Sequence, residues 1–95
     1  LRRAVAAAPT QARPHLVLAN GLRKQGDTSG AIAEYRRAIA LDDTLAEAHN
    51  NLGIVLEGRG ELDAAATAFA RAQALDPRQP LYGSNLARVR ALLGR

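Results

Sequence analysis

The amino-acid sequence predicts an all-α fold in which antiparallel helix–turn–helix units stack into an α-solenoid, a right-handed superhelix. Two observations predict it: a set of residue types recurs every 34 positions, and Ala and Leu dominate a chain in which only 3% of residues are aromatic. Alanine favours helices and, having a small side chain, lets two helices approach closely. A fixed period of this length is typical of stacked helical hairpins, each of which buries its apolar face against its neighbours.

The repeat becomes visible when the sequence is shifted by 34 residues against itself. The landmarks that coincide are Gly26 with Gly60 and Gly94, Leu22 with Leu56, Ala31 with Ala65, Tyr35 with Phe69, Ala38 with Ala72, and Asp42 with Asp76. This register predicts full units over 12–45 and 46–79. It also predicts that 1–11 is the tail of a preceding repeat and that 80–95 is the first helix of a further repeat or a cap. We therefore expect the chain to be part of a longer array.

Six helices are expected, at 1–8, 12–25, 28–41, 46–59, 62–75 and 80–93. In the first helix of each full unit two leucines lie four positions apart, which places them on one face. Gly26 and Gly60 follow these helices, and glycine suits the tight turn because it adopts positive φ without steric cost.

The second helix of each unit carries one apolar stripe, which spacings of four, three and three residues keep on a single face. The stripes are Ala31, Tyr35, Ala38 and Leu41 in one unit and Ala65, Phe69, Ala72 and Leu75 in the next. Pro77 then ends a second helix, because proline lacks the backbone N–H that a helix uses. Tyr35 and Phe69 are expected in equivalent buried positions.

These residues resemble a known repeat. The unit His49-Asn50-Asn51-Leu52-Gly53, continued by Leu56, Gly60, Ala65, Phe69, Ala72 and Asp76-Pro77, resembles the tetratricopeptide repeat (TPR). The resemblance covers essentially the whole chain, which looks like bacterial TPR arrays and the repeat region of O-linked sugar transferases. Three departures stand out: His15 and His49 replace the common first-helix aromatic residue, Asp43 replaces the linking proline, and Arg90 occupies the position of Leu22 and Leu56.

The resemblance implies a scaffold that binds a peptide or an extended protein segment in a concave groove lined by the first helices. Carried over by register, the groove candidates are Arg13, Leu16, Val17, Asn20, Arg23, Asn50, Asn51, Ile54, Asn85 and Arg88. An Asn side chain both donates and accepts hydrogen bonds, so Asn20, Asn51 and Asn85 are candidates to grip a peptide backbone. The alternative is that these Asn side chains are solvated or bond to a neighbouring loop.

A second family arrangement, the carboxylate clamp, fixes a peptide C-terminus with Lys, Arg and Asn side chains. Leu16, Leu81 and Asn85 fill its cationic positions here, so a buried carboxylate would be poorly compensated. Recognition of that type is not expected.

Other function classes are disfavoured by composition. The net charge is +4, and the basic residues are scattered along the chain, which is typical of a solvated surface and not of a nucleic-acid interface. Without Cys there is no thiolate metal site. His15 and His49 lie one repeat apart, roughly 10 Å by helix-packing distances, too far to share a metal ion. We expect no catalytic residue, metal or cofactor, and no apolar run approaches the roughly 20 residues of a membrane span.

Two alternative functions stay open. The chain could be the substrate-recruiting segment of a larger enzyme, such as a glycosyltransferase, or a self-assembly module whose end helices, including Leu92 and Leu93, stack on another copy. The excess of Arg over Lys, with many Ala, points to a GC-rich bacterial gene. The cellular compartment is left open, with the cytoplasm preferred.

Overall fold

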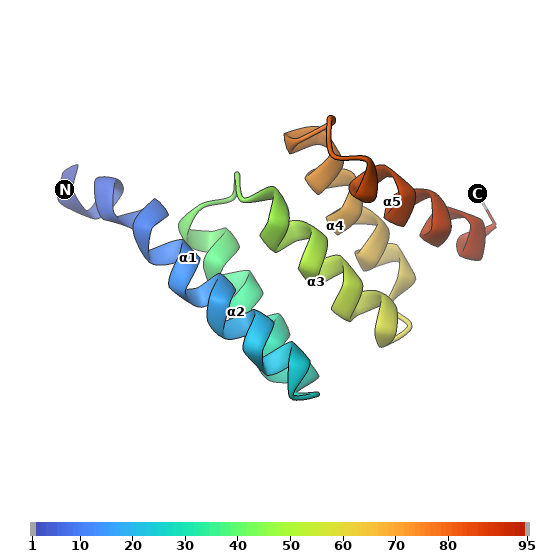
Figure 1. The fold of residues 1–95 in the computed structure, drawn as a ribbon, viewed down its shortest axis with the longest axis horizontal. Coiled ribbons are helices and arrows are strands. Elements are labelled where there is room, and N and C mark those ends of the chain that lie inside the picture. The colour runs from blue at the N-terminus through green and yellow to red at the C-terminus, as the bar shows by residue number, and fades with distance from the viewer. Residues whose placement is uncertain (1, 95) are drawn as a thin grey trace.

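The computed structural model describes residues 2–94, with side chains from Gln11 onward, and these residues form five α-helices connected by short turns (Figure 1). The helices are α1 (Arg2–Lys24), α2 (Thr28–Leu41), α3 (Ala46–Gly58), α4 (Leu62–Leu75) and α5 (Pro80–Leu93). No strand occurs between residues 2 and 94, which confirms the all-α prediction. None of the helices in this range is both long enough and apolar enough to cross a membrane.

The helices are arranged as hairpins that stack side by side. The α1–α2 and α3–α4 pairs have the most extensive contacts, and α2 against α3 and α4 against α5 join each hairpin to the next. In Figure 1, α1, α3 and α5 lie toward the viewer, and α2 and α4 lie behind them. The stack measures 46 × 29 × 18 Å.

The turns repeat with the sequence. Gly26, Gly60 and Gly94 all have positive φ, at 84°, 81° and 79°. At the first two turns the backbone N–H that follows the glycine donates back to Leu22 or Leu56, at 2.9 Å in both cases. This pairing satisfies carbonyls at the helix end that would otherwise lack a partner. The glycine turns are therefore structurally equivalent, as the period predicts.

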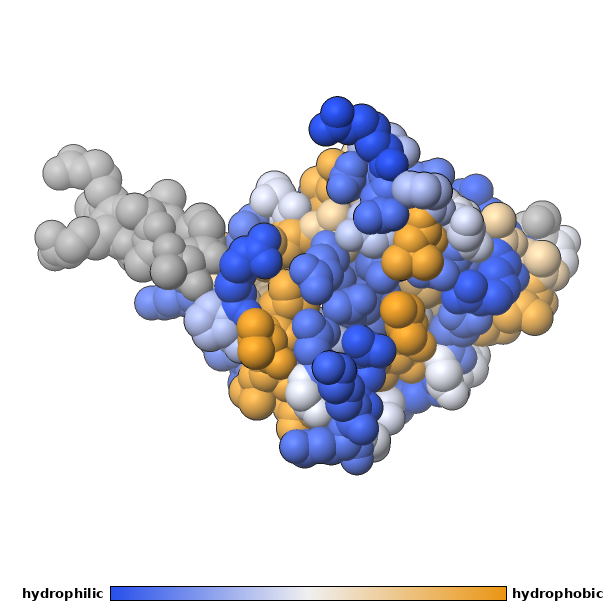
Figure 2. Space-filling model, in the orientation of Figure 1, coloured by the Kyte–Doolittle hydropathy of each residue, from blue (hydrophilic) through white to orange (hydrophobic). Residues whose placement is uncertain are grey.

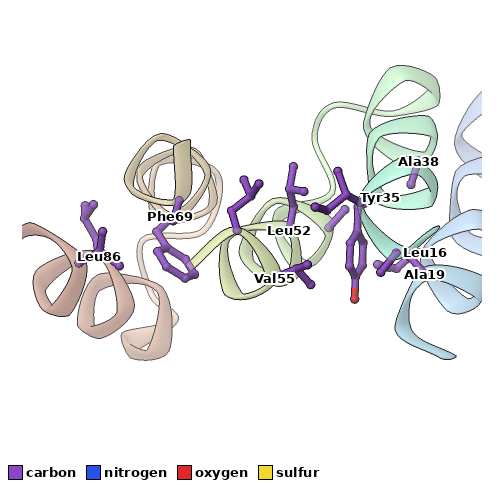
Figure 3. Close-up of a cluster of buried hydrophobic side chains, with 14 residues drawn as sticks. Leu16, Ala19, Tyr35, Ala38, Leu52, Val55, Phe69 and Leu86 are labelled. Atoms are coloured by element: carbon purple, nitrogen blue, oxygen red, sulfur yellow. The ribbon is translucent and has the colours of Figure 1, made fainter. Parts of the chain in front are cut away.

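The core repeats in the same way. Tyr35 and Phe69 are both fully buried (Figure 3), as are the alanines one helical turn before and after them, Ala31, Ala38, Ala65 and Ala72. Gly53 explains the close approach of α3 to α4, because a Cβ at this position would lie 2.7 Å from Cε1 of Phe69. The prediction that Tyr35 and Phe69 occupy equivalent positions is confirmed.

The first repeat differs from the others at one leucine. Leu18 is 50% exposed, whereas its equivalents Leu52 and Leu86 are 8% and 4% exposed. The helices α3 and α5 each pack against the second helix of the preceding hairpin. Leu18 has no such helix beside it among the described residues, so its apolar surface stays open.

The expected break between helices at 1–8 and 12–25 is wrong, because α1 runs through it from Arg2 to Lys24. Both Pro9 and Pro14 lie within this helix. A proline removes one backbone hydrogen bond, at a cost of about 3 kcal/mol, but the residues at 9–11 include no glycine that would favour a turn. The Ala-rich segment before them has high helix propensity.

The side chains of residues 1–10 lie outside the described residues, so their assignment to a preceding repeat stays a prediction. The other four helices agree with the predicted ranges to within one residue.

Candidate functional site

The helices α1, α3 and α5 form one face of the stack, which we call the first-helix face. All of the sequence-predicted binding residues lie on these helices, and their side chains range from exposed to deeply buried. Val17 is 68% exposed, and Arg13 and Arg88 are also exposed. Figure 2 shows that hydrophilic residues gather along the middle of this face, with hydrophobic residues on either side.

A chain of side-chain hydrogen bonds crosses the face between helices. The Nδ2 group of Asn85 donates to Oδ1 of Asn50 (2.8 Å), and Nδ2 of Asn50 donates to Oδ1 of Asn51 (3.2 Å). The Nδ2 group of Asn51 in turn donates to Oδ1 of Asn20 (3.0 Å). The four asparagines therefore link α5, α3 and α1 in one direction of donation.

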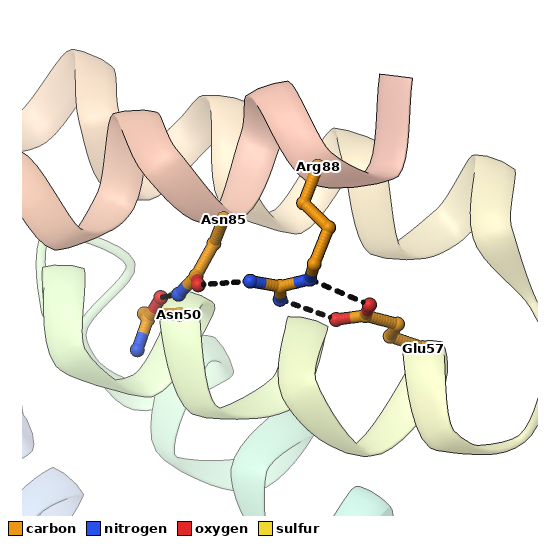
Figure 4. A network of polar contacts seen from close by, with 4 residues as sticks. All are labelled: Asn50, Glu57, Asn85 and Arg88. Atoms are coloured by element: carbon orange, nitrogen blue, oxygen red, sulfur yellow. Dashed lines mark hydrogen bonds and ion pairs between the residues drawn. The ribbon is translucent and has the colours of Figure 1, made fainter. Parts of the chain in front are cut away.

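The α5 end of this chain is fixed by an arginine. Arg88 donates from Nη1 to Oδ1 of Asn85 (3.0 Å), and its Nε and Nη2 groups form a two-pronged ion pair with Glu57 (2.9 and 2.6 Å; Figure 4). Hydrogen bonding to Arg88 lowers the pKa of Glu57. Bidentate pairs of this kind restrict geometry as well as adding energy, so Arg88 holds the end of the network in place.

The α1 end involves a residue that the sequence analysis assigned only to the core. Tyr35 is fully buried, and its hydroxyl reaches α1, where it donates to Oδ1 of Asn20 and accepts from Nε of Arg23 (3.1 Å). Burial raises the pKa of Tyr35. A signal existed in the sequence: the equivalent residue is Phe69, and a Tyr at a buried position usually needs a partner for its hydroxyl.

The asparagines are mostly buried. Asn50, Asn51 and Asn85 are 3%, 8% and 5% exposed, whereas Asn20 is half-buried. In the part of the chain with described side chains, no buried side-chain nitrogen or oxygen lacks a hydrogen-bond partner. Asn20 Oδ1 accepts two hydrogen bonds, from Tyr35 and Asn51, and is saturated. The Nδ2 group of Asn20 takes part in none of these bonds, so it is the part of this side chain that can still donate hydrogen bonds.

The repeat register explains one departure from the predicted groove. Leu16 is 2% exposed and belongs to the hydrophobic core, so it does not present a side chain to a ligand on the open face. Its equivalent one repeat later is Asn50, which is also buried, and the next is Ser84, which is exposed. At this position Asn50 faces the following first helix, because it bonds to Asn85 of α5, and Leu16 belongs to the core cluster that also contains Leu52 and Val55 of α3. Ser84 has no following helix among the described residues.

The adjacent register position faces the preceding first helix. Asn51 bonds to Asn20 of α1, and Asn85 bonds to Asn50 of α3, so both are buried in the seams between first helices. Val17 is the equivalent residue of α1 and is open. Ile54 is half-buried and packs against the core. Residues at these two register positions fill the seams between the first helices. Asn50, Asn51 and Asn85 do so through hydrogen bonds to one another and to Asn20, and Leu16 does so as part of the core.

Each of the two histidines forms a hydrogen bond to a nearby residue. His15 Nδ1 donates to Oε1 of Glu34 (2.6 Å), and Arg37 also pairs with that carboxylate. Hydrogen bonding to His15, followed by the Arg37 charge, lowers the pKa of Glu34. His49 Nε2 donates to the backbone carbonyl of Asp43 (3.0 Å). No group of three His, Cys, Asp or Glu residues that could hold a metal ion occurs among the residues searched, which are those the structure describes.

Comparisons with known proteins agree with this architecture. A family model described as "TPR repeat" matches residues 19–58, and a second, described as "Tetratricopeptide repeat", matches residues 46–79. Two crystal structures of MamA superpose with a TM-score of 0.84 and 25% sequence identity over 87% of this chain. The chain spans only 45% and 48% of the length of those MamA chains. A search of curated protein sequences gives no significant match. The chain belongs to the tetratricopeptide-repeat family.

Proposed function

We propose that the chain is a protein-interaction module that binds an extended segment of another protein across its first-helix face. Tetratricopeptide repeats are generally protein-interaction modules, and this chain contains two matches to them. The observation that carries the proposal is the polar network that ends at Asn20. It saturates the Asn20 oxygen and leaves the amide donors of that side chain for a ligand.

The surroundings of Asn20 support this role. Val17 lies three residues before Asn20 and therefore on the same side of α1, and it is 68% exposed. Leu81, on α5, is 51% exposed. Helices pack about 8–10 Å apart, so a ligand that crosses from α1 to α5 covers roughly 20 Å, or about six extended residues. Such a segment can place apolar side chains on Val17 and Leu81 and a backbone carbonyl against Asn20.

The buried asparagines have a different part in this proposal from the one expected from sequence. Asn50, Asn51 and Asn85 bond to one another, and they position Asn20 without contacting the ligand backbone themselves. A side chain that is already fixed loses little rotational entropy on binding. The network thus supports a pre-organised donor at the α1 end of the face.

The proposal can be tested with a random peptide library displayed on phage. The library is selected on the native chain and counter-selected on a Val17→Glu/Leu81→Glu variant. The matched control is Ala33→Glu/Ala74→Glu, which places the same charges at exposed positions of α2 and α4. We expect enriched peptides that bind the native chain and the control but not the first variant. Failure to enrich any peptide that binds the native chain and the control but not the first variant would overturn the proposal.

Backbone recognition has its own test in Asn20→Asp. This substitution keeps oxygen atoms for the Tyr35 and Asn51 donors but replaces the Nδ2 donors with a second oxygen. We expect a selected peptide to bind about tenfold more weakly, because one hydrogen bond is lost and a carbonyl meets a carboxylate. Affinity equal to that of the native chain would show that Asn20 does not donate to the ligand.

A second candidate function, self-association through the end helices, is favoured by Leu18 on α1 and Leu92 on α5, which are 50% and 60% exposed. Sedimentation across a range of concentrations tests it. Association that Leu18→Glu/Leu92→Glu abolishes would support this function, and a monomer at every concentration would contradict it. Recruitment of a substrate to a catalytic domain of a larger protein is a special case of the first proposal, with that substrate as the ligand.

A further inference from the structure

A second surface with ligand-binding character lies between the second helices. It is an open groove of about 540 Å³ between α2 and α4, with α3 as its floor, and we call it the second-helix groove. Its floor is apolar, with Leu52 and Leu56 of α3, and Ala68 of α4 lines one wall. Leu52 and Asn50 are two positions apart in α3, which is about 200° around the helix. The second-helix groove and the polar network therefore occupy opposite sides of α3.

The depth of this groove follows from the sequence of α4. The α4 side chains that line it include Ala64, Thr67 and Ala68, which are small. On α2, Ile39 lines the opposite wall and is only half-buried. Because Ala64, Thr67 and Ala68 do not reach across toward α2, the space between the two helices stays open, with Leu52 and Leu56, only 8% and 2% exposed, closing its floor.

The charged residues that line the groove have one sign. Arg36 and Arg71 line it together with His49, and no acidic residue does. Both arginines are exposed. The ion pairs formed by the described arginines use Arg37, Arg59 and Arg88, which leaves the guanidinium groups of Arg36 and Arg71 available to a ligand.

The hairpin topology brings these three basic residues toward one end of the groove. His49 lies in the first turn of α3, and Arg36 and Arg71 lie in the last two turns of α2 and α4. Because successive helices are antiparallel, the start of α3 lies beside the ends of α2 and α4. Leu56 and Ala64 form the other, apolar end. The groove thus has a cationic end and an apolar end.

We propose that the second-helix groove binds an amphipathic segment of a partner protein, with apolar side chains against Ile39 and Ala64 on its walls and a carboxylate beside Arg36 and Arg71. The groove extends over about seven residues of α3, or roughly 10 Å, which matches two turns of a helix with apolar residues three or four positions apart. Charge complementarity makes the occupant acidic.

A second copy of the chain does not fit this description. The chain carries a net charge of +4, and neither α1 nor α5, the helices at the two ends of the stack, contains an Asp or Glu. An end helix from another copy would therefore bring like charge to Arg36 and Arg71. The occupant is a different, acidic protein, and because the two sites are on opposite sides of α3, one chain can join two partners.

The test is a random peptide library displayed on phage, selected on the native chain and counter-selected on Arg36→Glu/Arg71→Glu. The matched control, Arg78→Glu/Arg90→Glu, makes the same change of charge at exposed arginines outside the groove. We expect peptides that distinguish the native chain from the groove variant to carry apolar residues three or four positions apart and Asp or Glu at one end. Synthetic copies should bind the groove variant about tenfold more weakly and the control within about twofold.

A second variant, Thr67→Trp, fills the groove without changing its charge and should also block these peptides, so the result does not rest on the arginine variant folding normally. Asn20→Asp should leave their affinity unchanged, which separates this site from the first-helix face. The proposal is overturned if no peptide distinguishes the native chain from either groove variant, if the selected peptides are neutral or basic, or if the control loses binding equally.

Discussion

Replacement of Asn50 by Ala tests whether the polar network on the first-helix face is a structural element. Asn50 donates to Asn51 and accepts from Asn85, and both partners are more than nine-tenths buried. Its removal leaves one buried acceptor and one buried donor unpaired. Each stranded group costs about 1–3 kcal/mol, and alanine returns a few tenths through helix propensity. We therefore expect Asn50→Ala to lower the free energy of unfolding by about 2–5 kcal/mol.

The loss is measurable by urea unfolding followed by far-UV circular dichroism. A slope of about 1 kcal/mol/M converts this loss to a midpoint shift of about 2–5 M. The loss itself is a large part of the roughly 5–15 kcal/mol of stability typical of native proteins. The matched control is Ser84→Ala, at the same repeat position but exposed, which should change stability by less than about 0.5 kcal/mol. If Asn50→Ala costs no more than Ser84→Ala, the network is not holding α3 to α5.

Three further predictions concern other parts of the fold. Tyr35→Phe removes a hydroxyl with two hydrogen bonds but keeps the buried ring, so it should cost about 1–2 kcal/mol, whereas Tyr35→Ala should cost about 3–5 kcal/mol; equal losses in chemical denaturation would contradict the assigned hydrogen bonds. Gly53→Ala places a methyl group against the Phe69 ring and should cost about 1–3 kcal/mol despite the better helix propensity of alanine; an unchanged or higher melting temperature would show that α3 and α4 can separate at no cost. The carboxyl groups of Glu34 and Glu57 have lowered pKa values, so their stabilising effect is complete above about pH 4.5 and is lost as pH falls through the lowered values. Melting temperature should therefore fall on acidification, and less so in Glu34→Gln; equal acid sensitivity of the two proteins would count against the Glu34 pairing.

The 34-residue repeat predicted most of the fold. Equivalent glycines, alanines and aromatic residues fixed the register, because the 34-residue period reflects translation of one hairpin along the stack. The continuity of α1 through Pro9 and Pro14 was not predictable from that register. A proline normally ends a helix, at a cost of about 3 kcal/mol. The summed helix propensity of the neighbouring alanines is of similar size, so the register does not show which of the two effects dominates.

The candidate site was predictable in composition but not in pairing. Register identified Asn20, Asn51 and Asn85 as residues of one face, yet it could not show that Asn50 connects them. It also grouped Leu16 with exposed residues, because a single repeat does not reveal which positions face a neighbouring hairpin. The second-helix groove depends on how much space the small α4 side chains leave open toward α2, and the spacing of residues in the sequence does not show this distance.

The most direct test of the proposed binding role is a calorimetric titration of one selected peptide into the native chain and into the Asn20→Asp protein. Thermal melts first establish that the two proteins have the same stability. The proposal expects the substituted protein to retain its stability and to lose most of its affinity for the peptide. Identical binding isotherms for the two proteins would contradict it.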